Sequence, residues 1–360
     1  MAKSTTQQQA VSGGENGSRL EEDEHEKIHV SPVTESSKPG ELAVPADEWG
    51  GLEPTEKKMG MVSLVLDKGV KTTVVGTIYG MDFEIEGDNY KVDVYLDYYN
   101  RRLKILDYEV DGDFSPMLER LAYLAEANDF EKIFVKASPD DFQNWITHGY
   151  LFEGILRYFY KGKDSYVLSR FSTSERLHSS KLLEEVQLVE RLIYKTPLKS
   201  TRELGPDIEI TQASKDDIPE LVLIYRDVFE TYPSPLTNPD YISATMDRNV
   251  IYQIARVKGE SVAAASAEIS VKHSNAEMTD CATVASAQGR GIMQHLLMEL
   301  EKDLKKKGIM TAYTLARAPS FGMNCAFFRL GYEFSGRLIN NCDIFGHYED
   351  MNIWVKRLDI

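Results

Sequence analysis

The sequence predicts a mixed α/β (α+β) protein with a polar tail and two α/β regions. Three observations carry this prediction. Segments that alternate between apolar and polar residues recur from residue 61 onward and indicate strands. Segments with apolar residues three and four positions apart lie between them and indicate helices. The first 58 residues show neither pattern and are rich in Gln, Ser, Gly and Glu, a composition typical of disorder.

The first α/β region starts with strands and continues with alternating helices and strands. Pro116 favours a helix start, because a proline ring is tolerated in the first turn. Gly149 ends the second helix, and Pro197 ends the third, because a residue before proline avoids the helical region. The expected strands are 62–66, 74–78, 83–85, 92–96, 103–105, 133–135 and 151–160, and the expected helices are 115–127, 140–148 and 174–194.

The second α/β region has a different order of elements. Asp216 and Asp217 favour a helix start, and Gly331 ends the last helix. The expected strands are 208–210, 251–258, 262–270, 276–285, 309–316, 334–339 and 351–355, and the expected helices are 216–229, 241–247, 292–307 and 324–330.

These segments predict how the chain is divided. We expect a disordered acidic and polar tail, an N-terminal α/β domain without a catalytic constellation, a helical linker and a second α/β domain. The corresponding ranges are 1–58, 59–172, 173–206 and 207–360.

Composition and charge narrow the classes of partner. The net charge of −16 disfavours nucleic acid, because phosphate neutralisation needs a basic surface. No apolar run reaches the length of a membrane span and no signal-peptide pattern is present, so we expect a cytoplasmic protein with no membrane partner. The seven histidines show no ligand spacing, and neither do Cys281, Cys325 and Cys342, so no metal is expected.

The most informative stretch is 283–293, where a strand, a glycine turn and a helix follow one another. Gly289 and Gly291 permit a close approach of the backbone, and the helix start adds partial positive charge. This geometry presents free backbone N–H groups to an anion. A nucleotide P-loop would need Lys and Ser or Thr after the last glycine, and a dinucleotide fingerprint would need glycine where Gln294 stands.

The order of elements and two motifs resemble the GNAT-type N-acyltransferases over residues 207–358. The family's turn is Gln/Arg-x-x-Gly-x-Gly/Ala, and residues 286–291 read Ser-Ala-Gln-Gly-Arg-Gly, with Ser286 departing at the leading position. The family's second signature matches residues 324–332, which read Asn-Cys-Ala-Phe-Phe-Arg-Leu-Gly-Tyr. The resemblance implies the GNAT fold, in which helices flank a mixed central sheet.

Longer strings are similar to the β-lysine acetyltransferase branch of this family. They read Phe-Glu-Thr-Tyr-Pro at 229–233, Thr-Asp-Cys-Ala-Thr at 279–283 and Gly-Arg-Leu-Ile-Asn-Asn at 336–341, and Gly-Tyr-Leu-Phe-Glu-Gly at 149–154 in the first region. The resemblance implies acetyl transfer from acetyl-CoA to the terminal (N6) amine of β-lysine, giving the compatible solute (osmolyte) N-ε-acetyl-β-lysine. It further implies a small-molecule amine as partner, a homodimer as candidate assembly, and a degenerate, non-catalytic GNAT half in the first region.

The same resemblance implies the residues that hold acetyl-CoA. Backbone groups of residues 282–284 are expected to hold the pantetheine arm, and backbone N–H groups of residues 288–293 the diphosphate. Asn324 is a candidate hydrogen-bond partner of the cofactor, or alternatively a helix cap. The full set is Ala282, Thr283, Val284, Gln288, Gly289, Arg290, Gly291, Ile292, Met293 and Asn324.

The reaction needs a base, because a lysine-like amine with a pKa of ~10.4 is neutral in only about one molecule in 2,500 at pH 7. Glu277 is the first candidate, at a strand position where relatives that acetylate lysine carry a glutamate. Asp280 is the rival, although odd spacing places it on the opposite face unless a β-bulge intervenes. Glu268, on the neighbouring strand, is a candidate for binding the substrate's ammonium group.

The candidates for the acid and for substrate binding are less direct. Many relatives use a tyrosine where this chain has Phe327, so Tyr332 and Tyr313 are the substitutes, and departure of the thiolate without an acid is the alternative. Arg317 is a candidate for a bidentate pair with the carboxylate of β-lysine. Tyr232 lies where the family builds its acceptor site.

Two other functions stay open at this point. The acceptor is another diamine or a protein lysine in one of them, with the same chemistry. The other is a non-catalytic acyl-CoA sensor, suggested by Ser286 and Phe327 at positions where relatives carry functional side chains.

Overall fold

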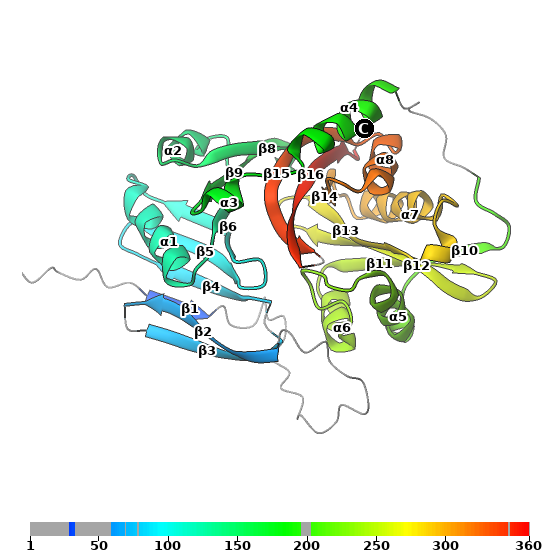
Figure 1. Ribbon diagram of the computed structural model, residues 1–360, viewed down its shortest axis with the longest axis horizontal. Coiled ribbons are helices and arrows are strands. Elements are labelled where there is room, and N and C mark those ends of the chain that lie inside the picture. The colour runs from blue at the N-terminus through cyan, green and yellow to red at the C-terminus, as the bar shows by residue number, and fades with distance from the viewer. Residues whose placement is uncertain are drawn as a thin grey trace, which may run out of the picture.

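The computed structural model describes residues 29–32, 59–68, 70–77, 79–195, 203–344 and 346–359. Figure 1 shows an N-terminal half, in blue to green, beside a C-terminal half, in green to red. The elements of the first half are β1 (His29–Pro32), β2 (Met59–Asp67), β3 (Val70–Thr77), β4 (Met81–Glu86), β5 (Tyr90–Asp97), β6 (Arg102–Val110), α1 (Ser115–Ala127), β7 (Lys132–Ala137), α2 (Phe142–Thr147), β8 (Leu151–Tyr160) and β9 (Lys163–Phe171). Two helices follow, α3 (Ser174–Leu177) and α4 (Leu182–Lys195).

The C-terminal half has the order of elements that the sequence predicted. Its elements are β10 (Ile208–Gln212), α5 (Ile218–Val228), α6 (Pro239–Asp247), β11 (Val250–Val257), β12 (Glu260–Ser270), β13 (Asn275–Thr283), α7 (Ile292–Lys306), β14 (Thr311–Arg317), α8 (Phe321–Arg329), β15 (Glu333–Ile344) and β16 (His347–Arg357). The prediction of a mixed sheet flanked by helices is therefore confirmed for this half.

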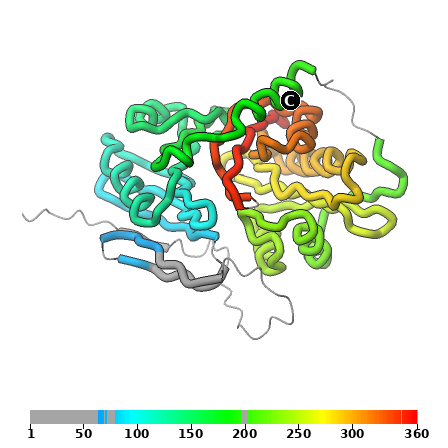
Figure 2. Tube along the Cα trace, in the orientation of Figure 1, coloured from blue at the N-terminus to red at the C-terminus, as the bar shows by residue number. Residues whose placement is uncertain are grey.

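A single sheet connects the two halves. Its strand order is β1-β4-β5-β6-β7-β9-β8-β15-β16-β14-β13-β12-β11-β10, and β2 and β3 form a separate hairpin. The tube in Figure 2 shows β15 and β16, in red, between the two halves. The last strand pair of one half thus lies against the last strand pair of the other.

The N-terminal half repeats the topology of the C-terminal half. The sheet order β4-β5-β6-β7-β9-β8 corresponds strand by strand to β11-β12-β13-β14-β16-β15. In each set the third and fourth strands are parallel neighbours, and a helix, α1 or α7, connects them. We call β4–β9 the N-terminal repeat and β11–β16 the C-terminal repeat. The sequence predicted a degenerate GNAT half here. The structure has the six strands and the connecting helix of this topology, but among the described residues it has no counterpart of α5 and α6.

Three details differ from the predicted elements. Strand β9 was not predicted, because its polar Ser165 and Ser169 are buried and hydrogen-bonded to Ala137 and Glu153. The single helix expected over 174–194 is two helices, since the chain is extended at His178. Residues 29–32 pair with β4 as β1, within the segment expected to be a disordered tail. The rest of that predicted tail, and residues 196–202 of the predicted linker, lie outside the described residues.

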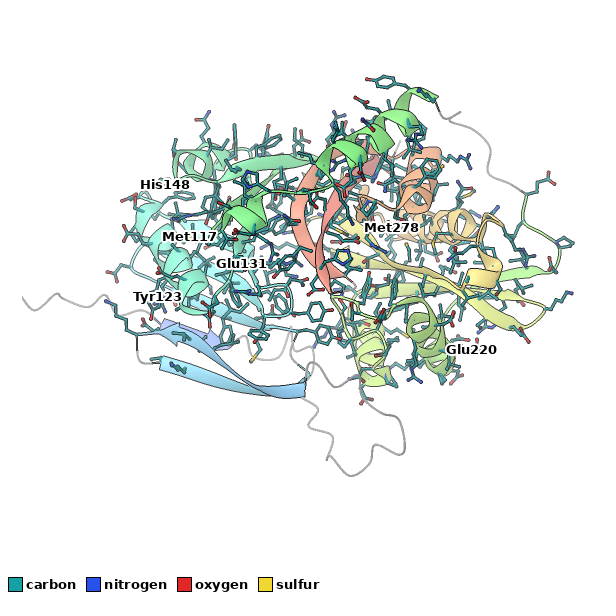
Figure 3. The ribbon with its side chains drawn as sticks, viewed as in Figure 1. Met117, Tyr123, Glu131, His148, Glu220 and Met278 are labelled. Carbon is teal, nitrogen blue, oxygen red and sulfur yellow. The ribbon has the colours of Figure 1, made fainter. Side chains whose placement is uncertain are left out.

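Helices divide the faces of the sheet into separate cores. In the C-terminal half, α7 and α8 pack on one face and α5 and α6 on the other. In the N-terminal half, α1 and α2 pack on one face. Met117 and Met278, both fully buried and labelled in Figure 3, mark the N-terminal core and the core under α7. A further cluster, which includes Phe134, Phe159 and Tyr313, joins the two halves.

Two glycines allow the repeats to meet. Gly154 on β8 pairs with Gly336 on β15, whose φ is 149°. A Cβ atom on Gly336 would lie 2.4 Å from the carbonyl oxygen of Glu153, closer than any side chain tolerates. The backbones can therefore approach only because both positions lack a side chain.

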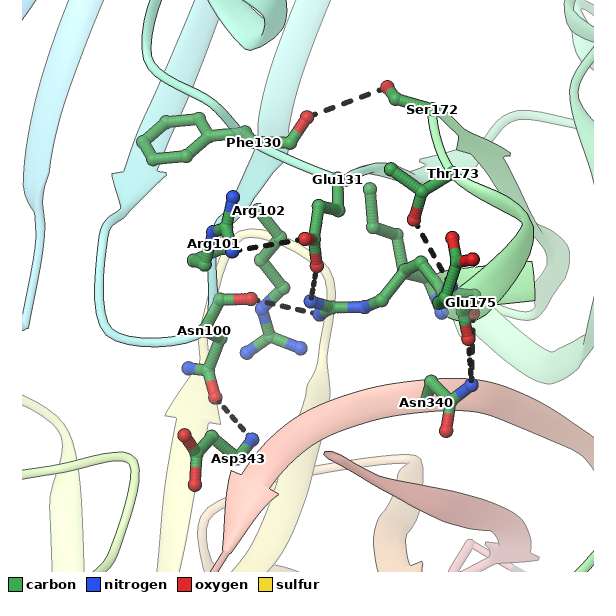
Figure 4. A network of polar contacts seen from close by, with 12 residues as sticks. Asn100, Arg101, Arg102, Phe130, Glu131, Ser172, Thr173, Glu175, Asn340 and Asp343 are labelled. Carbon is green, nitrogen blue, oxygen red and sulfur yellow. Dashed lines mark hydrogen bonds and ion pairs between the residues drawn. The ribbon is translucent and has the colours of Figure 1, made fainter. Parts of the chain in front are cut away.

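A polar network continues this junction, as Figure 4 shows. Arg176 donates to the Asn100 carbonyl at 2.9 Å and forms an ion pair with Glu131 at 3.2 Å. Asn340 donates to the Glu175 carbonyl at 3.2 Å, and the Asp343 N–H donates to the Asn100 side chain at 2.8 Å. These contacts link α3 and the N-terminal repeat to β15.

Among the described residues, no helix has both the length and the apolar character that crossing a bilayer requires.

Candidate active site

The site begins where β13 and β14 separate. These parallel strands pair only over their first three residues, ending with Glu277 and Tyr313. β13 then continues along β12, whereas β14 continues along β16. In the described part of the chain, the inner edges of both strands beyond these residues have no strand partner, and a wedge lies between them. An extended ligand arm can pair with such edges through main-chain hydrogen bonds.

Alternation along β13 decides which backbone groups face the wedge. The Val284 N–H donates to the Val262 carbonyl on the β12 side at 2.9 Å. Successive residues of a strand point their backbone groups to opposite sides, so Ala282 also faces β12, and Cys281 and Thr283 face the wedge. This geometry favours Cys281 and Thr283 for holding a pantetheine arm over the predicted Ala282 and Val284.

The glycine turn follows β13 through a short 3-10 turn, Ala285–Ala287. Gly289 and Gly291 have φ angles of 74° and 82°, which glycine adopts without strain. Gly291 is the N-cap of α7, and the first-turn N–H groups, including those of Ile292 and Met293, have no partner within the helix. The turn therefore presents donors at the positive end of a helix dipole, an arrangement that binds phosphate.

Side chains of the turn hold its shape. Gln288 donates through Nε2 to the Thr283 carbonyl at 3.2 Å. Arg290 forms an ion pair with Asp207 at 3.0 Å, and its hydrogen bond lowers the pKa of Asp207. Because the guanidinium is joined to the segment before β10, the backbone of Arg290 is the group placed for a diphosphate.

Two glutamates from adjacent strands lie opposite each other at the closed end of the wedge. Glu268 on β12 is the register partner of Glu277 on β13, which is in turn the partner of Tyr313 on β14. Part of the Glu268 side chain is accessible to solvent, but many protein atoms lie around its carboxylate. The resulting loss of hydration is the largest cause of its raised pKa, and the charge of Glu277 is the second. Glu277 is half-buried and accepts a hydrogen bond from the Tyr313 hydroxyl.

Asp280 joins this pair because β13 contains a bulge. The register with β12 shifts between Ala264 and Ser266, and Asp280 has a φ of 50°. The buried carboxylate accepts a hydrogen bond from Ser266 Oγ at 2.6 Å, and Ser266 shares a strand face with Glu268. Burial, opposed by this hydrogen bond and assisted by the charges of Glu268 and Glu277, raises the pKa of Asp280 to about 6. All three carboxylates therefore lie on one face.

The loop after α5 closes one side of the carboxylate cluster. Tyr232 stacks on Phe229 with ring centroids 4.3 Å apart, and its hydroxyl forms a hydrogen bond with Asp280. Tyr241 of α6 lies near the same carboxylates, since burial and then the charges of Asp280 and Glu268 raise its pKa. Tyr232 thus lies beside the carboxylates, in the region where the sequence predicted acceptor binding.

The structure does not bring Tyr332 to this cluster. Its ring is 2% exposed, packs edge-on against Phe327 at 5.0 Å and belongs to the core under α7. Its hydroxyl faces Glu301 of α7. A phenol in this position has no path to a leaving thiolate, so the predicted role of Tyr332 as acid finds no support. Of the two tyrosines predicted as acids, Tyr313 is the one at the site, where it contacts Glu277.

The Asn324 side chain is fully used within the protein. Its Nδ2 donates to the carbonyls of Arg317 at 2.9 Å and Ser320 at 2.7 Å. Its Oδ1 accepts from Asn352 Nδ2 and Trp354 Nε1, both at 2.8 Å. Because α8 begins before this residue, the side chain is not its N-cap either. Asn324 ties β14, α8 and β16 together instead of contacting the cofactor.

Arg317 is paired with Glu349. Its Nε and Nη2 both contact the carboxylate, the second at 2.7 Å, and the Glu349 side chain is 4% exposed. A bidentate pair occupies the edge that a substrate carboxylate would need. The geometry therefore favours a structural role for Arg317 over the predicted substrate contact.

The N-terminal repeat brings two lysines to the site that no motif in the sequence indicates. Lys136 on β7 donates to Tyr313 Oη at 2.9 Å, and Lys104 on β6 lies 4.4 Å from the centre of the Tyr95 ring. The charges of both lysines oppose the burial that raises the pKa of Glu268. Each lysine stands at a polar position of an alternating strand, a pattern that indicates a solvated face unless the tertiary fold is known.

A cavity of about 600 Å³ lies apart from the wedge and the carboxylate cluster. Its lining includes Lys215, Met246 and Lys307 but none of Glu268, Glu277 and Asp280. Its acid, Asp247, forms an ion pair with Lys215 at 2.7 Å, so the wedge is the better candidate for the chemistry. Within the described ranges, no group of three or more His, Cys, Asp or Glu side chains is arranged to hold a metal ion.

Comparisons with known proteins agree with this geometry. Residues 218–332 match the acetyltransferase (GNAT) family. The chain is 35% identical over 262 residues to the N-acetyltransferase YodP of Bacillus subtilis, covering 73% of this chain and 94% of that protein. It is 35% identical to a β-lysine N(6)-acetyltransferase of Methanosarcina mazei, covering 69% of this chain and 98% of the relative. It is 33% identical to a β-lysine N(6)-acetyltransferase of Methanococcus maripaludis, covering 71% and 93%.

These matches cover 69–73% of this chain and nearly the whole of each relative. The glycine turn before α7 and the wedge between β13 and β14 stand where the family model matches. The chain is accordingly a member of the GNAT acetyltransferase family and an acyltransferase.

Proposed function

We propose that this protein transfers the acetyl group of acetyl-CoA to the terminal (N6) amine of β-lysine, giving N-ε-acetyl-β-lysine. The pair of Glu268 and Glu277 at the closed end of the wedge is the observation that carries the proposal. Together with Asp280 these residues form a cluster of carboxylates suited to a substrate with two ammonium groups. Similarity to relatives named β-lysine N(6)-acetyltransferases supports this choice of acceptor.

The wedge and the glycine turn would hold the co-substrate. Backbone groups of Cys281 and Thr283 face the wedge and suit the pantetheine arm. The N–H groups from Arg290 to Met293 suit the diphosphate. Acetyl-CoA supplies an activated thioester, and this placement brings its carbonyl carbon to the carboxylate cluster.

Glu277 is the candidate base. It lies between Glu268 and the Tyr313 hydroxyl, so an ammonium group bound here can give a proton to its carboxylate. The neutral nitrogen then forms a bond to the acetyl carbon while the carbon–sulfur bond breaks. The nitrogen releases its second proton as the amide forms, and the thiolate takes up this proton. Asp280 and Glu268 hold the substrate's positive charge during these steps.

The test is an assay of the purified protein with acetyl-CoA and β-lysine. We expect release of free thiol in proportion to amine, and a product whose fragmentation places the acetyl group on N6. A panel of diamines and lysine peptides measures the competing acceptors. Faster turnover of a diamine or a peptide would replace the acceptor, and coenzyme binding without turnover of any amine would indicate a sensor.

A cytoplasmic location belongs to this proposal. Cys281, Cys325 and Cys342 are all free thiols, as expected of a reducing compartment. Acetyl-CoA is also a cytoplasmic metabolite, so the reaction would take place where its co-substrate is made.

A further inference from the structure

The topological repeat relates the candidate base to a lysine. Glu277 stands third in β13, and Lys104 stands third in β6, the corresponding strand. Both residues belong to the parallel strand pair of their repeat. The strand partners are Glu268 and Tyr313 in the C-terminal repeat, and Tyr95 and Phe134 in the N-terminal repeat. The N-terminal repeat therefore carries a cation where the C-terminal repeat carries its carboxylate.

The two corresponding sites face each other. Lys104 and Lys136 lie on the face of the N-terminal sheet opposite to α1, because Leu103, Ile105 and their neighbours pack against that helix. Lys136 reaches Tyr313 Oη at 2.9 Å, and Tyr313 is the strand partner of Glu277. Residues of one repeat thus lie within hydrogen-bond distance of the catalytic strands of the other.

This arrangement is fixed by contacts at the start of β13 and β14. Asn275 donates through Nδ2 to the Phe159 carbonyl at 2.8 Å, and both groups are buried. Thr311 donates to the Tyr158 carbonyl at 3.3 Å, and Lys272 forms an ion pair with Asp107. Because these contacts lie beside the site, the lysines have a defined position relative to Glu277.

The ammonium groups of the two lysines are not neutralised by an internal ion pair. In the described chain, Lys104 contacts the Tyr95 ring, and Lys136 contacts the Tyr313 hydroxyl and the rings of Phe159 and Tyr313. Both lysines are half-buried. The charges of Glu277 and Glu268 act on Lys136 without forming an ion pair at contact distance in the described chain, so both ammonium groups keep donors for an anion from solution.

We propose that the N-terminal repeat supplies the carboxylate-binding half of the acceptor site, with Lys104 and Lys136 binding the carboxylate of an amino-acid substrate. The inference rests on the proposed function and names the part of the site that selects a diamino acid over a diamine. Glu268, Glu277 and Asp280 attract the ammonium groups, and the lysines attract the opposite end. Arg317, the side chain that the sequence suggested for this role, is bound to Glu349.

The experiment compares pairs of substrates that differ only in the carboxylate. β-Lysine is paired with pentane-1,4-diamine, its decarboxylated form, and L-lysine with pentane-1,5-diamine. For wild-type protein we expect a higher kcat/KM for the acid of each pair. Lys104→Met and Lys136→Met should lower kcat/KM for the acid by about 10- to 100-fold more than kcat/KM for the diamine, since only the acid loses a charged hydrogen bond to the lysine. Any loss through the contact of Lys136 with Tyr313 should affect both substrates of a pair equally. The KM for acetyl-CoA should not change.

Two further variants keep the result interpretable. Lys163→Met removes an exposed lysine of the same repeat and should leave kcat/KM unchanged for both the acid and the diamine. Lys104→Arg keeps the charge and should retain most of the preference for the acid, even if Lys104→Met folds poorly. An equal loss for acid and diamine in the Met variants would overturn the inference, as would a wild-type preference for the diamine. A different outcome would separate the two proposals. If the wild-type protein prefers another amino acid to β-lysine, and the Met variants still lose more kcat/KM for that acid than for its diamine, then the proposed acceptor is wrong and the carboxylate site at Lys104 and Lys136 is supported.

Discussion

Glu268 on β12 and Glu277 on β13 are directly opposed partners in an antiparallel ladder, with the Tyr313 hydroxyl bound to the second of them. Like charges in this position destabilise a sheet unless a cation or a proton separates them. Burial and the charge of Glu277 raise the pKa of Glu268, which Lys104 and Lys136 only partly oppose. The repulsion between the two carboxylates therefore favours binding of a positive charge, which an ammonium substrate supplies.

The first prediction concerns Glu277. Replacing it by Gln keeps the size and the hydrogen bonding but removes the proton acceptor, so kcat should fall by about 100-fold or more. The KM for acetyl-CoA should stay near the wild-type value, because the glycine turn is unchanged. Steady-state kinetics in both substrates measure this split. Glu209→Gln, on the exposed face of β10, is the matched control. A variant with unchanged kcat would transfer the role of base to Asp280.

The second prediction concerns the pH dependence of activity. Asp280 has a pKa of about 6, so its carboxylate ionises just below neutral pH. We expect kcat/KM for the amine to rise with pH through about 6, because the charged form helps to hold the ammonium group. Asp280→Asn should remove this acid limb and lower kcat/KM at neutral pH. A pH profile that keeps its limb near 6 in the Asn variant would show that another group titrates there.

The same substitution should stabilise the protein at neutral pH. The folded state raises the pKa of Asp280 from 3.8 to about 6, so folding binds the proton more tightly than the unfolded chain does. Ionisation therefore costs stability progressively between pH 4 and 6, and about 3 kcal/mol above that range. Asn cannot ionise and accepts the Ser266 hydrogen bond. Urea unfolding at pH 8 should show the variant to be the more stable protein, and the difference should vanish below pH 4.

The third prediction separates Arg317 from substrate binding. Arg317→Ala leaves Glu349, whose side chain is 4% exposed, without its bidentate partner. We expect a loss of about 2 kcal/mol in the free energy of unfolding, as for a charged hydrogen bond at a partly exposed arginine. The KM for the amine should change by less than twofold in the folded variant. A large rise in the KM for the amine with unchanged stability would show instead that Arg317 binds the substrate.

The local parts of this site could be predicted from the sequence. The glycine turn and the helix after it follow from spacing, and the choice of Glu277 on β13 follows from the family resemblance; the structure has the turn, the helix and the two strands where the sequence placed them. For Asp280, the sequence predicted only that a β-bulge would be needed to bring it to the face of Glu277; it did not predict that the bulge is present. The alternating pattern assumes that each residue of a strand pairs with one residue of its neighbour, so it cannot show where a strand contains an extra, unpaired residue.

The tertiary parts could not be predicted. Lys104 and Glu277 are far apart in the chain, and their relation depends on a repeat whose two copies share topology but not residue types. Asn324 belongs to a motif typical of the family, yet only the structure shows Trp354 and Asn352 saturating its oxygen. Strand β9 was missed because its buried serines make the segment appear polar.

The last prediction concerns the junction on which the shared site depends. Lys132 of β7 and Glu153 of β8 form an ion pair at 3.0 Å, with side-chain exposures of 0% and 4%. Lys132 also donates to the Ile339 carbonyl at 2.9 Å, and the Ile339 N–H donates to Glu153 at 2.6 Å, so the pair joins the N-terminal repeat to β15. Burial lowers the pKa of Lys132 to about 8, against the attraction of Glu153. A charge left here without its partner would remain desolvated.

We therefore expect Lys132→Met and Glu153→Gln each to lower the free energy of unfolding by about 3–5 kcal/mol, and the double variant to lose much less than the sum. Arg157 of β8 and Glu333 of β15 form the control pair, because they also join the N-terminal repeat to β15, at 2.7 Å, with exposures of 49% and 69%. Breaking that exposed pair should leave the unfolding curve close to the wild-type curve. Additive losses in the buried pair would show that Lys132 and Glu153 act separately, and that the ion pair between them does not stabilise the junction of the repeats.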